Sequence, residues 1–265
     1  MNVTKVLAVV LPPVVVGAVL LGVWQLVVVG FDIQPYLLPA PSAIWSALLD
    51  RLGDIWDAMF VTGTNALIGL IVGTLFGIAM SFVLMRFQTM NELVTPLAIA
   101  LNAIPIIVLV PVFNNMFSST TEVPRRLMVT LIVFFIVMIN VAKGLRQVAP
   151  IHLELMKSYA ASPREILVKT RIPNAVPYLF TALKIAAPGA VITAFVAEYF
   201  GGRQNGLGYS ITSNAASSRT DAMWAYVVGA CVLGLVFYLV SAGLERATSP
   251  QQQVGGLAPG GATSS

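Results

Sequence analysis

Six long apolar segments, separated by shorter polar stretches, dominate the pattern of this chain. A helix needs about 20 apolar residues to cross the ~30 Å hydrocarbon core of a bilayer, and most of these segments approach or exceed that length. The segments cover about Val6–Val29, Ala58–Met85, Leu93–Phe117, Leu127–Ala142, Phe180–Phe200 and Trp224–Leu244. The pattern therefore predicts an all-α membrane protein with six transmembrane helices.

Composition agrees with this class and limits the number of domains. Hydrophobic residues make up 57% of the chain and charged residues 10%, and the mean hydropathy is +0.86, which is above the range of soluble domains. No polar stretch between the apolar segments is long enough to enclose a core of its own. We therefore expect one transmembrane domain over residues 1–247. Residues 248–265 are rich in Gly, Ser, Gln and Ala, and we expect them to form a disordered cytoplasmic tail.

Basic residues are distributed unevenly between the two sides of the predicted membrane domain. If the N-terminus lies in the cytoplasm, ten Lys and Arg residues fall on the cytoplasmic side and five on the outer side. Such an excess predicts this orientation, with both termini inside the cell. The exception is the pair Arg125 and Arg126, which flanks a span on the outer side. The basic residues do not cluster with aromatic residues, so we expect lipid rather than nucleic acid as a partner.

Residue types that carry catalysis are scarce. None of the five lysines follows a glycine, so the chain has no phosphate-binding G-x-x-x-x-G-K-[ST] loop. Cys231 has no second cysteine to pair with, and a single histidine, His152, excludes an H-E-x-x-H zinc site. We therefore expect no catalytic residue, metal or cofactor in this chain. A membrane scaffold without transport activity stays an alternative on composition alone.

Two features outside the polar loops bear on packing. Gly69, Gly73 and Gly77 recur every four residues on one face of the second apolar segment, a spacing that lets membrane helices approach closely. We favour general packing within the membrane, with a subunit interface as the alternative. Before that segment, apolar residues at helical spacing from Ile44 to Leu52 predict a short amphipathic helix at the outer interface.

Polar residues inside the other segments are candidates for a solute pathway. The third segment contains three prolines, Pro105 among them, together with Asn102. We interpret it as one kinked helix that lines a pathway or, with equal weight, as a structural kink. Asn140 gives a weaker signal of the same kind. Glu198 is the one acid inside an apolar run, and we expect it near the outer interface, solvated, with a structural or gating role rather than a substrate contact.

The most polar stretch, residues 143–178, carries six basic and two acidic residues between apolar segments. Ser162 and Glu165 form an S-x-x-E capping box with Pro163 at the first helical position, so a helix should begin there and end before Pro173. A shorter helix over about 153–159 precedes it. Two short helices with a small-residue corner between them predict a rigid knob outside the membrane. An amphipathic connector that rests on lipid headgroups is an equal alternative on this pattern alone.

This loop resembles the EAA loop of membrane subunits of bacterial ABC importers, E-A-A-x-x-x-G followed by I-x-L-P. Glu154 stands at the Glu of that motif, Ala160 at its Gly, and Pro173 at its Pro. Other segments resemble the nitrate/sulfonate/taurine branch of the family. They are Leu38–Ser42, Ile104–Pro105, Val196–Glu198 and Gly206–Tyr209.

The resemblance implies a type I importer permease fold and a set of partners. It implies an ABC ATPase dimer that binds ATP and Mg²⁺, a second permease subunit, and a periplasmic or lipid-anchored binding protein that delivers the solute. It also implies the bacterial inner membrane as the location and the loop as the contact with the ATPase. The residues implied in that contact are Glu154, Tyr159, Ala160, Ala161, Ser162, Pro163, Arg164, Glu165 and Pro173.

The chain says little about the solute itself. We see no ring of Arg or Lys within the predicted spans that would mark an anion site. We therefore expect a small organic or aromatic compound, with a small oxyanion or a sulfonate as the alternative.

Overall fold

The computed structural model describes residues 3–102 and 104–248, and this part of the chain contains helices and no β-strand. The prediction of an all-α protein is confirmed. The helices group into two compact units, one within Met1–Val61 and Gln204–Cys231 and the other within Thr62–Arg203 and Val232–Ser265. Helices α3 (Leu52–Arg86) and α11 (Thr220–Thr248) run from one unit into the other.

The first unit contains α1 (Val3–Gly30), α2 (Pro41–Asp50), α10 (Gly206–Ala216) and the starts of α3 and α11. The indole rings of Trp24 and Trp224 meet edge to face, with 5.3 Å between centroids, which joins α1 to α11. Helix α2 is the predicted amphipathic helix, and Ile44 is buried on its inner face. It ends at Asp50, however, so Leu52 belongs to α3 and not to this face.

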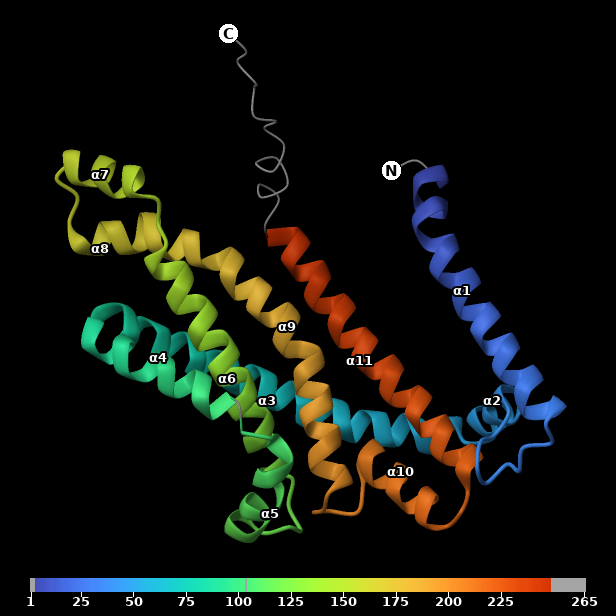
Figure 1. Ribbon diagram of the computed structural model, residues 1–265. Coiled ribbons are helices and arrows are strands. Elements are labelled where there is room, and N and C mark those ends of the chain that lie inside the picture. The colour runs from blue at the N-terminus through green and yellow to red at the C-terminus, as the bar shows by residue number, and fades with distance from the viewer. Residues whose placement is uncertain (1–2, 103, 249–265) are drawn as a thin grey trace. The chain divides into compact units, whose positions relative to one another are not determined.

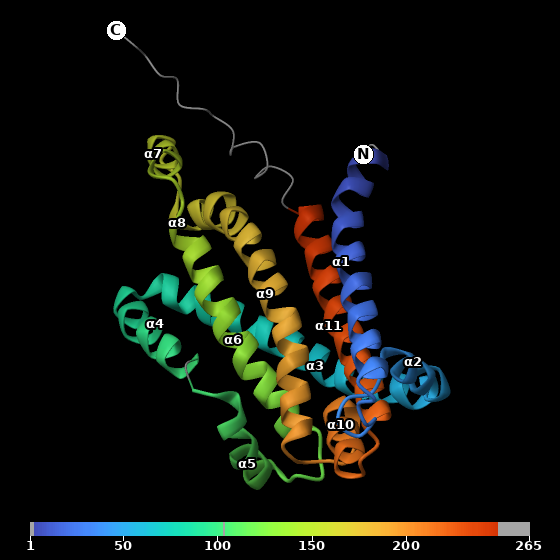
Figure 2. The same cartoon turned by 45° about the vertical axis from the view of Figure 1, so that its right-hand side comes forward.

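The second unit is built around α6 (Val123–Arg146) and α9 (Ile172–Tyr199), which lie side by side along much of their length (Figures 1 and 2). Helix α9 presents small residues to this contact. Ala182, Ala186, Ala190 and Ala194 recur every four residues and are fully buried. Small side chains let the two helix backbones approach, which supplies dispersion contacts where lipid removes the hydrophobic drive.

The glycine face of α3 packs against α6 within the same unit. A methyl group added to Gly73 would lie 2.7 Å from the Thr130 carbonyl oxygen, and one added to Gly77 would lie 2.9 Å from Cβ of Val137. A methyl group added to Gly69 would lie closer still to Val129. These distances leave no room for a side chain at any of the three positions. The close approach of α3 and α6 therefore depends on glycine.

Five helices of the described chain are long and apolar enough to cross a membrane, and they correspond to the first, second, fourth, fifth and sixth predicted spans. The third predicted span is not one helix. It consists of α4 (Gln88–Asn102) and α5 (Ile106–Phe117), separated at Ile104–Pro105. Pro96 and Pro111 lie inside these helices, so only Pro105 stands at the break, immediately before α5. The interpretation of a single kinked helix is therefore wrong.

Candidate functional site

The polar stretch 143–178 forms the predicted knob from α7 (Pro150–Ser158) and α8 (Pro163–Ile166) (Figure 1). The capping box at α8 is present. The backbone N–H of Glu165 donates to Oγ of Ser162 at 3.3 Å, and the backbone N–H of Ser162 donates to the Glu165 carboxylate at 2.9 Å. The Ser162 hydroxyl also donates to the Glu165 carboxylate at 2.9 Å. Because the negative carboxylate accepts the bonds from the backbone N–H and the hydroxyl of Ser162, they lower the pKa of Glu165 below its ordinary value of 4.5, and Lys169 adds to the effect.

The corner between α7 and α8 closes through a Schellman motif. The backbone N–H of Ala160 donates to the Lys157 carbonyl at 2.9 Å, and that of Ala161 donates to the Met156 carbonyl at 3.0 Å. This pair of bonds requires a left-handed residue at the first position past the cap, and Ala160 has a φ of 52°. The geometry explains why the resembling motif has glycine here: glycine adopts this conformation without strain.

The helix that begins at Ser162 does not end before Pro173, contrary to the sequence prediction. The π-helix η1 (Leu167–Arg171) follows α8 and continues into α9, with Pro173 in the first turn of α9. A π turn bonds each N–H to the carbonyl five residues back, as the Ile172 N–H does to Leu167. The wider turn ends at Arg171, two residues before Pro173, so the proline falls in the first turn of α9, where a missing N–H costs little.

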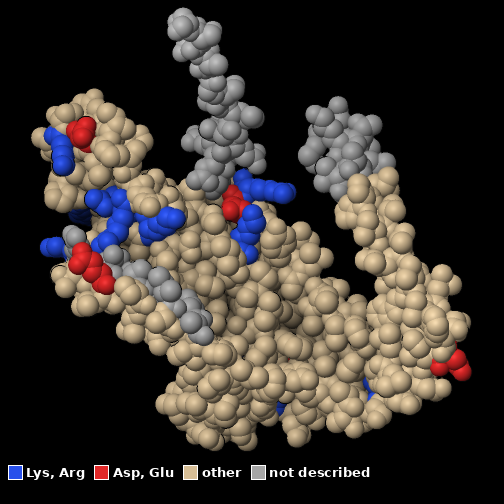
Figure 3. All heavy atoms as spheres, in the orientation of Figure 1, with Lys and Arg blue, Asp and Glu red and all other residues tan. Residues whose placement is uncertain are grey.

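The surface of the knob carries a stripe of apolar side chains. Ile151, Leu155 and Tyr159 recur every four residues around α7 and its cap, and they are 65%, 51% and 75% exposed. Helices α7, α8 and η1 bury no residue. Glu154 and Arg164 of the same loop are exposed, and Figure 3 shows basic residues gathered at this end of the unit.

The base of the knob is fastened to the end of α6. Asn174 donates through Nδ2 to the Gly144 carbonyl at 2.7 Å and to the Gln147 carbonyl at 3.3 Å. The Arg171 guanidinium donates to the Leu145 carbonyl at 2.9 Å. The sequence analysis did not single out these residues. Only their position after the loop, near the end of a helix with open carbonyls, hinted at the contact.

A second polar cluster lies at the opposite ends of α6 and α9. Glu122 accepts hydrogen bonds from Arg125 at 2.9 Å and from Asn65 of α3 at 2.9 Å, and Arg203 approaches it at 3.6 Å. Arg126 completes the cluster by donating to Asn65 at 3.0 Å. Arg125 is buried, with 1% of its side chain exposed. The arginine pair is thus part of an internal network, which explains how a charge can sit at the end of a span.

The pathway candidates lie in different environments. Glu198 is 2% exposed, so the expectation that it is solvated is wrong; it accepts a hydrogen bond of 2.8 Å from the Thr62 hydroxyl. Asn140 donates to the Ile136 carbonyl of its own helix at 2.8 Å. Pro105 precedes α5 at the break between two helices. The side chain of Asn102 lies outside the described residues.

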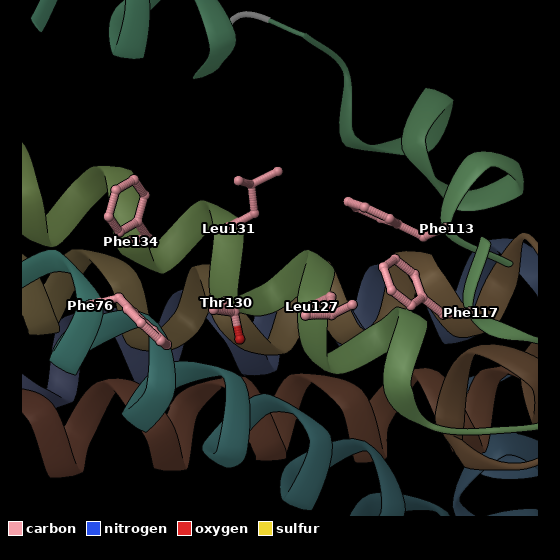
Figure 4. A pocket seen from close by; sticks show the side chains of 7 residues that line it. All are labelled: Phe76, Phe113, Phe117, Leu127, Thr130, Leu131 and Phe134. Carbon is pink, nitrogen blue, oxygen red and sulfur yellow. The ribbon is translucent and has the colours of Figure 1, made fainter. Parts of the chain in front are cut away.

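An apolar pocket of about 310 Å³ lies in the second unit (Figure 4). Its lining comes from α3, α5 and α6, and consists of Phe76, Phe113, Phe117, Leu127, Thr130, Leu131 and Phe134. The one polar group, the Thr130 hydroxyl, donates to the Arg126 carbonyl at 2.7 Å. The pocket therefore offers nothing to a charged solute, whose desolvation would go uncompensated.

Residues 69–250 match the family model described as the binding-protein-dependent transport system inner membrane component. A probable ABC transporter permease protein of Haemophilus influenzae is 29% identical, over 86% of this chain and 92% of its own length. The formylaminopyrimidine transport permease protein of Halalkalibacterium halodurans is 30% identical, over 82% and 86%. The MetNI methionine transporter in an inward-facing conformation shares the fold, with a TM-score of 0.58 and 17% identity over 75% of this chain and 95% of that one.

Proposed function

The chain belongs to the family of binding-protein-dependent transport system inner membrane components, and we propose that its α7–α8 knob is the surface on which an ATPase subunit docks. The chain is a permease of an ATP-binding-cassette importer for a small solute. ATP and Mg²⁺ bind to the partner, because the chain has no phosphate-binding loop of its own.

One observation carries the assignment of the knob. Ile151, Leu155 and Tyr159 form an exposed apolar stripe on a helix that lies outside the predicted spans and buries nothing of its own. An apolar stripe on one face of a helix is suited to a groove of a partner protein, which contacts the side chains at positions i, i+4 and i+8. The capping box and the Schellman motif hold the helix in shape before it binds, so little conformational entropy is lost on docking.

The remaining partners follow from the family and from the distribution of charge. The basic loop 143–178 faces the cytoplasm, where the ATPase is, and both termini lie on the same side. A second permease subunit completes the pathway, and a binding protein delivers the solute from outside. Glu198 and the Glu122 cluster then lie toward the outer end. Their role is to hold α3, α6 and α9 together, rather than to contact the solute.

For the solute, we propose a small uncharged organic or aromatic compound. The buried Arg125 is engaged by Glu122, and the pocket of phenylalanines favours an apolar or aromatic group. A relative named for formylaminopyrimidine transport supports this class. Relatives named for transport of taurine and of aliphatic sulfonates support a sulfonate as the second candidate. A thermal-shift screen of the partner binding protein against both classes distinguishes the two.

Docking is tested by purifying the tagged chain from membranes and measuring how much ATPase is retained with it. The ATPase is recognised by its phosphate-binding loop. Leu155→Glu places a charge in the middle of the stripe, and we expect it to abolish ATPase retention while the permease stays at normal abundance in the membrane. Lys157→Gln is the matched control, since Lys157 is exposed on the same helix, about 200° around the helix axis from Leu155. Equal ATPase retention by Leu155→Glu and Lys157→Gln would reject α7 as the docking helix.

A further inference from the structure

The knob has almost no packing of its own, and this makes its base the critical link. None of the residues of α7, α8 and η1 is buried, whereas α6 and α9 contain many fully buried residues. The knob therefore offers few packed side chains that could pass a force from α7 to the membrane helices. Within the described residues, the main connection lies at the two ends of the loop, where α6 stops, α9 begins and η1 contacts both helices.

Those two ends are joined by hydrogen bonds that serve carbonyls left open by the end of a helix. The last carbonyls of α6 have no partner within the helix, and side chains or solvent must satisfy them. The Asn174 amide donates a hydrogen bond to the Gly144 carbonyl at 2.7 Å, and the Arg171 guanidinium donates one to the Leu145 carbonyl at 2.9 Å. Both donors come from the other end of the loop, three residues apart and hence on one face of the helix.

The hydrogen bonds of Arg171 and Asn174 to the end of α6 form a clamp at the base of the knob. Close backbone contact reinforces this clamp. A methyl group added to Gly144 would lie 2.9 Å from Cα of Ala175 and 2.8 Å from the ring of Tyr178, so the two helices nearly touch there. The end of α6 is in turn tied to the end of α3, because Arg146 donates to the Leu84 carbonyl at 2.7 Å. A displacement at the base is thereby shared among α3, α6 and α9.

We infer that Arg171 and Asn174 are positioning residues that make the knob and the α6–α9 pair move as one body when the ATPase closes. The inference rests on the proposed docking of the ATPase at α7. Without the clamp, the knob can swing about the ends of the loop, and closure of the ATPase moves the loop without moving the membrane helices. ATP hydrolysis by the partner then continues without transport of the solute.

The test measures the rigidity of the clamp directly. Spin labels are attached to cysteines at Lys157 and Ile192, both exposed, in a Cys231→Ser background, and the distance between them is measured by pulsed electron resonance. We expect one narrow distance population in the labelled parent, both without nucleotide and in the ATPase complex trapped with Mg-ATP and vanadate. Asn174→Leu and Arg171→Ala should each add a second population of detached knobs.

Each variant should raise the ratio of detached to clamped knobs about fivefold, the factor by which one typical hydrogen bond shifts an equilibrium. Arg171→Lys keeps a positively charged donor group and should restore part of the narrow population. Lys169→Gln is the matched control, because Lys169 bonds to Glu165 at 3.4 Å within the knob and has no bond to α6 among those described. The untrapped ATPase complexes of the variants should still hydrolyse ATP, with a weaker response to the binding protein.

A purely local stabilising role predicts a lower melting temperature of the chain with the distance population and the response to the binding protein unchanged, and this result would overturn the inference. The same holds if Asn174→Leu and Arg171→Ala both match Lys169→Gln in every readout. Distances in the isolated chain report the clamp without an ATPase. A finding that the ATPase does not dock at α7 would therefore refute the proposed function, whereas the clamp would still be tested by the distances in the isolated chain.

Discussion

Replacing Ala160 with glycine should stabilise the corner of the knob. Ala160 has a φ of 52°, and an L-residue with a Cβ is strained in this left-handed conformation by roughly 1–2 kcal/mol. Glycine has no such strain, although it loses roughly 0.5–1 kcal/mol more backbone entropy than alanine on folding. The net gain for Ala160→Gly is therefore about 0.5–1 kcal/mol, which is about two- to fivefold in the equilibrium for opening the corner.

Hydrogen exchange of the Ala161 amide measures this gain, because its N–H is bonded to the Met156 carbonyl only when the corner is closed. We expect slower exchange by the same two- to fivefold in Ala160→Gly, after correction for the intrinsic rate. Ala160→Val should exchange faster than the parent, since a β-branched residue tolerates a positive φ least. Equal or faster exchange in Ala160→Gly would show that the left-handed corner is not strained and that the argument from φ is wrong.

Three further predictions concern packing, charge and pH. Gly73→Ala should destabilise the chain by about 1–3 kcal/mol in thermal unfolding, because α3 and α6 must separate, whereas Gly234→Ala, which meets nothing within 4 Å, should cost under 1 kcal/mol. Glu122→Gln leaves the buried Arg125 without its carboxylate and should cost roughly 3–5 kcal/mol in the same assay; a loss below about 1 kcal/mol would contradict the network. Because its folded-state pKa is lowered, Glu165 stabilises the α8 cap above pH 4.5, and this contribution should be lost as the pH falls through the lower folded value; hydrogen exchange at the cap should show no such pH dependence in Glu165→Gln.

The local features of the knob could be read from the sequence because they depend on neighbouring residues. Ser162 and Glu165 are three positions apart, and this spacing alone predicts both bonds of the capping box. The continuation through Pro173 could not be predicted in the same way. The rule that proline stops a helix assumes α geometry, and here a π turn places the proline at the start of a new α segment.

Features that depend on contacts between distant residues were not predictable. Three prolines in the third segment look alike in sequence, yet only Pro105 stands at a break. Glu198 looked like a solvated acid at the end of a span because nothing nearby in sequence shows Thr62, which lies 136 positions away and donates to it. The clamp of Arg171 and Asn174 requires knowing where α6 ends in space, which no periodicity records.

The central claim is that the ATPase docks on α7, and site-directed cross-linking tests it most directly. A benzophenone maleimide is attached to a cysteine at Tyr159 or, as the control, at Arg219, in a Cys231→Ser background. Both positions are exposed, and Arg219 lies in the loop before α11, on the predicted outer side. After illumination in membranes, the account predicts a cross-link to the ATPase subunit from Tyr159 and none from Arg219. A cross-link from Arg219 with none from Tyr159 would contradict both the docking surface and the orientation of the chain.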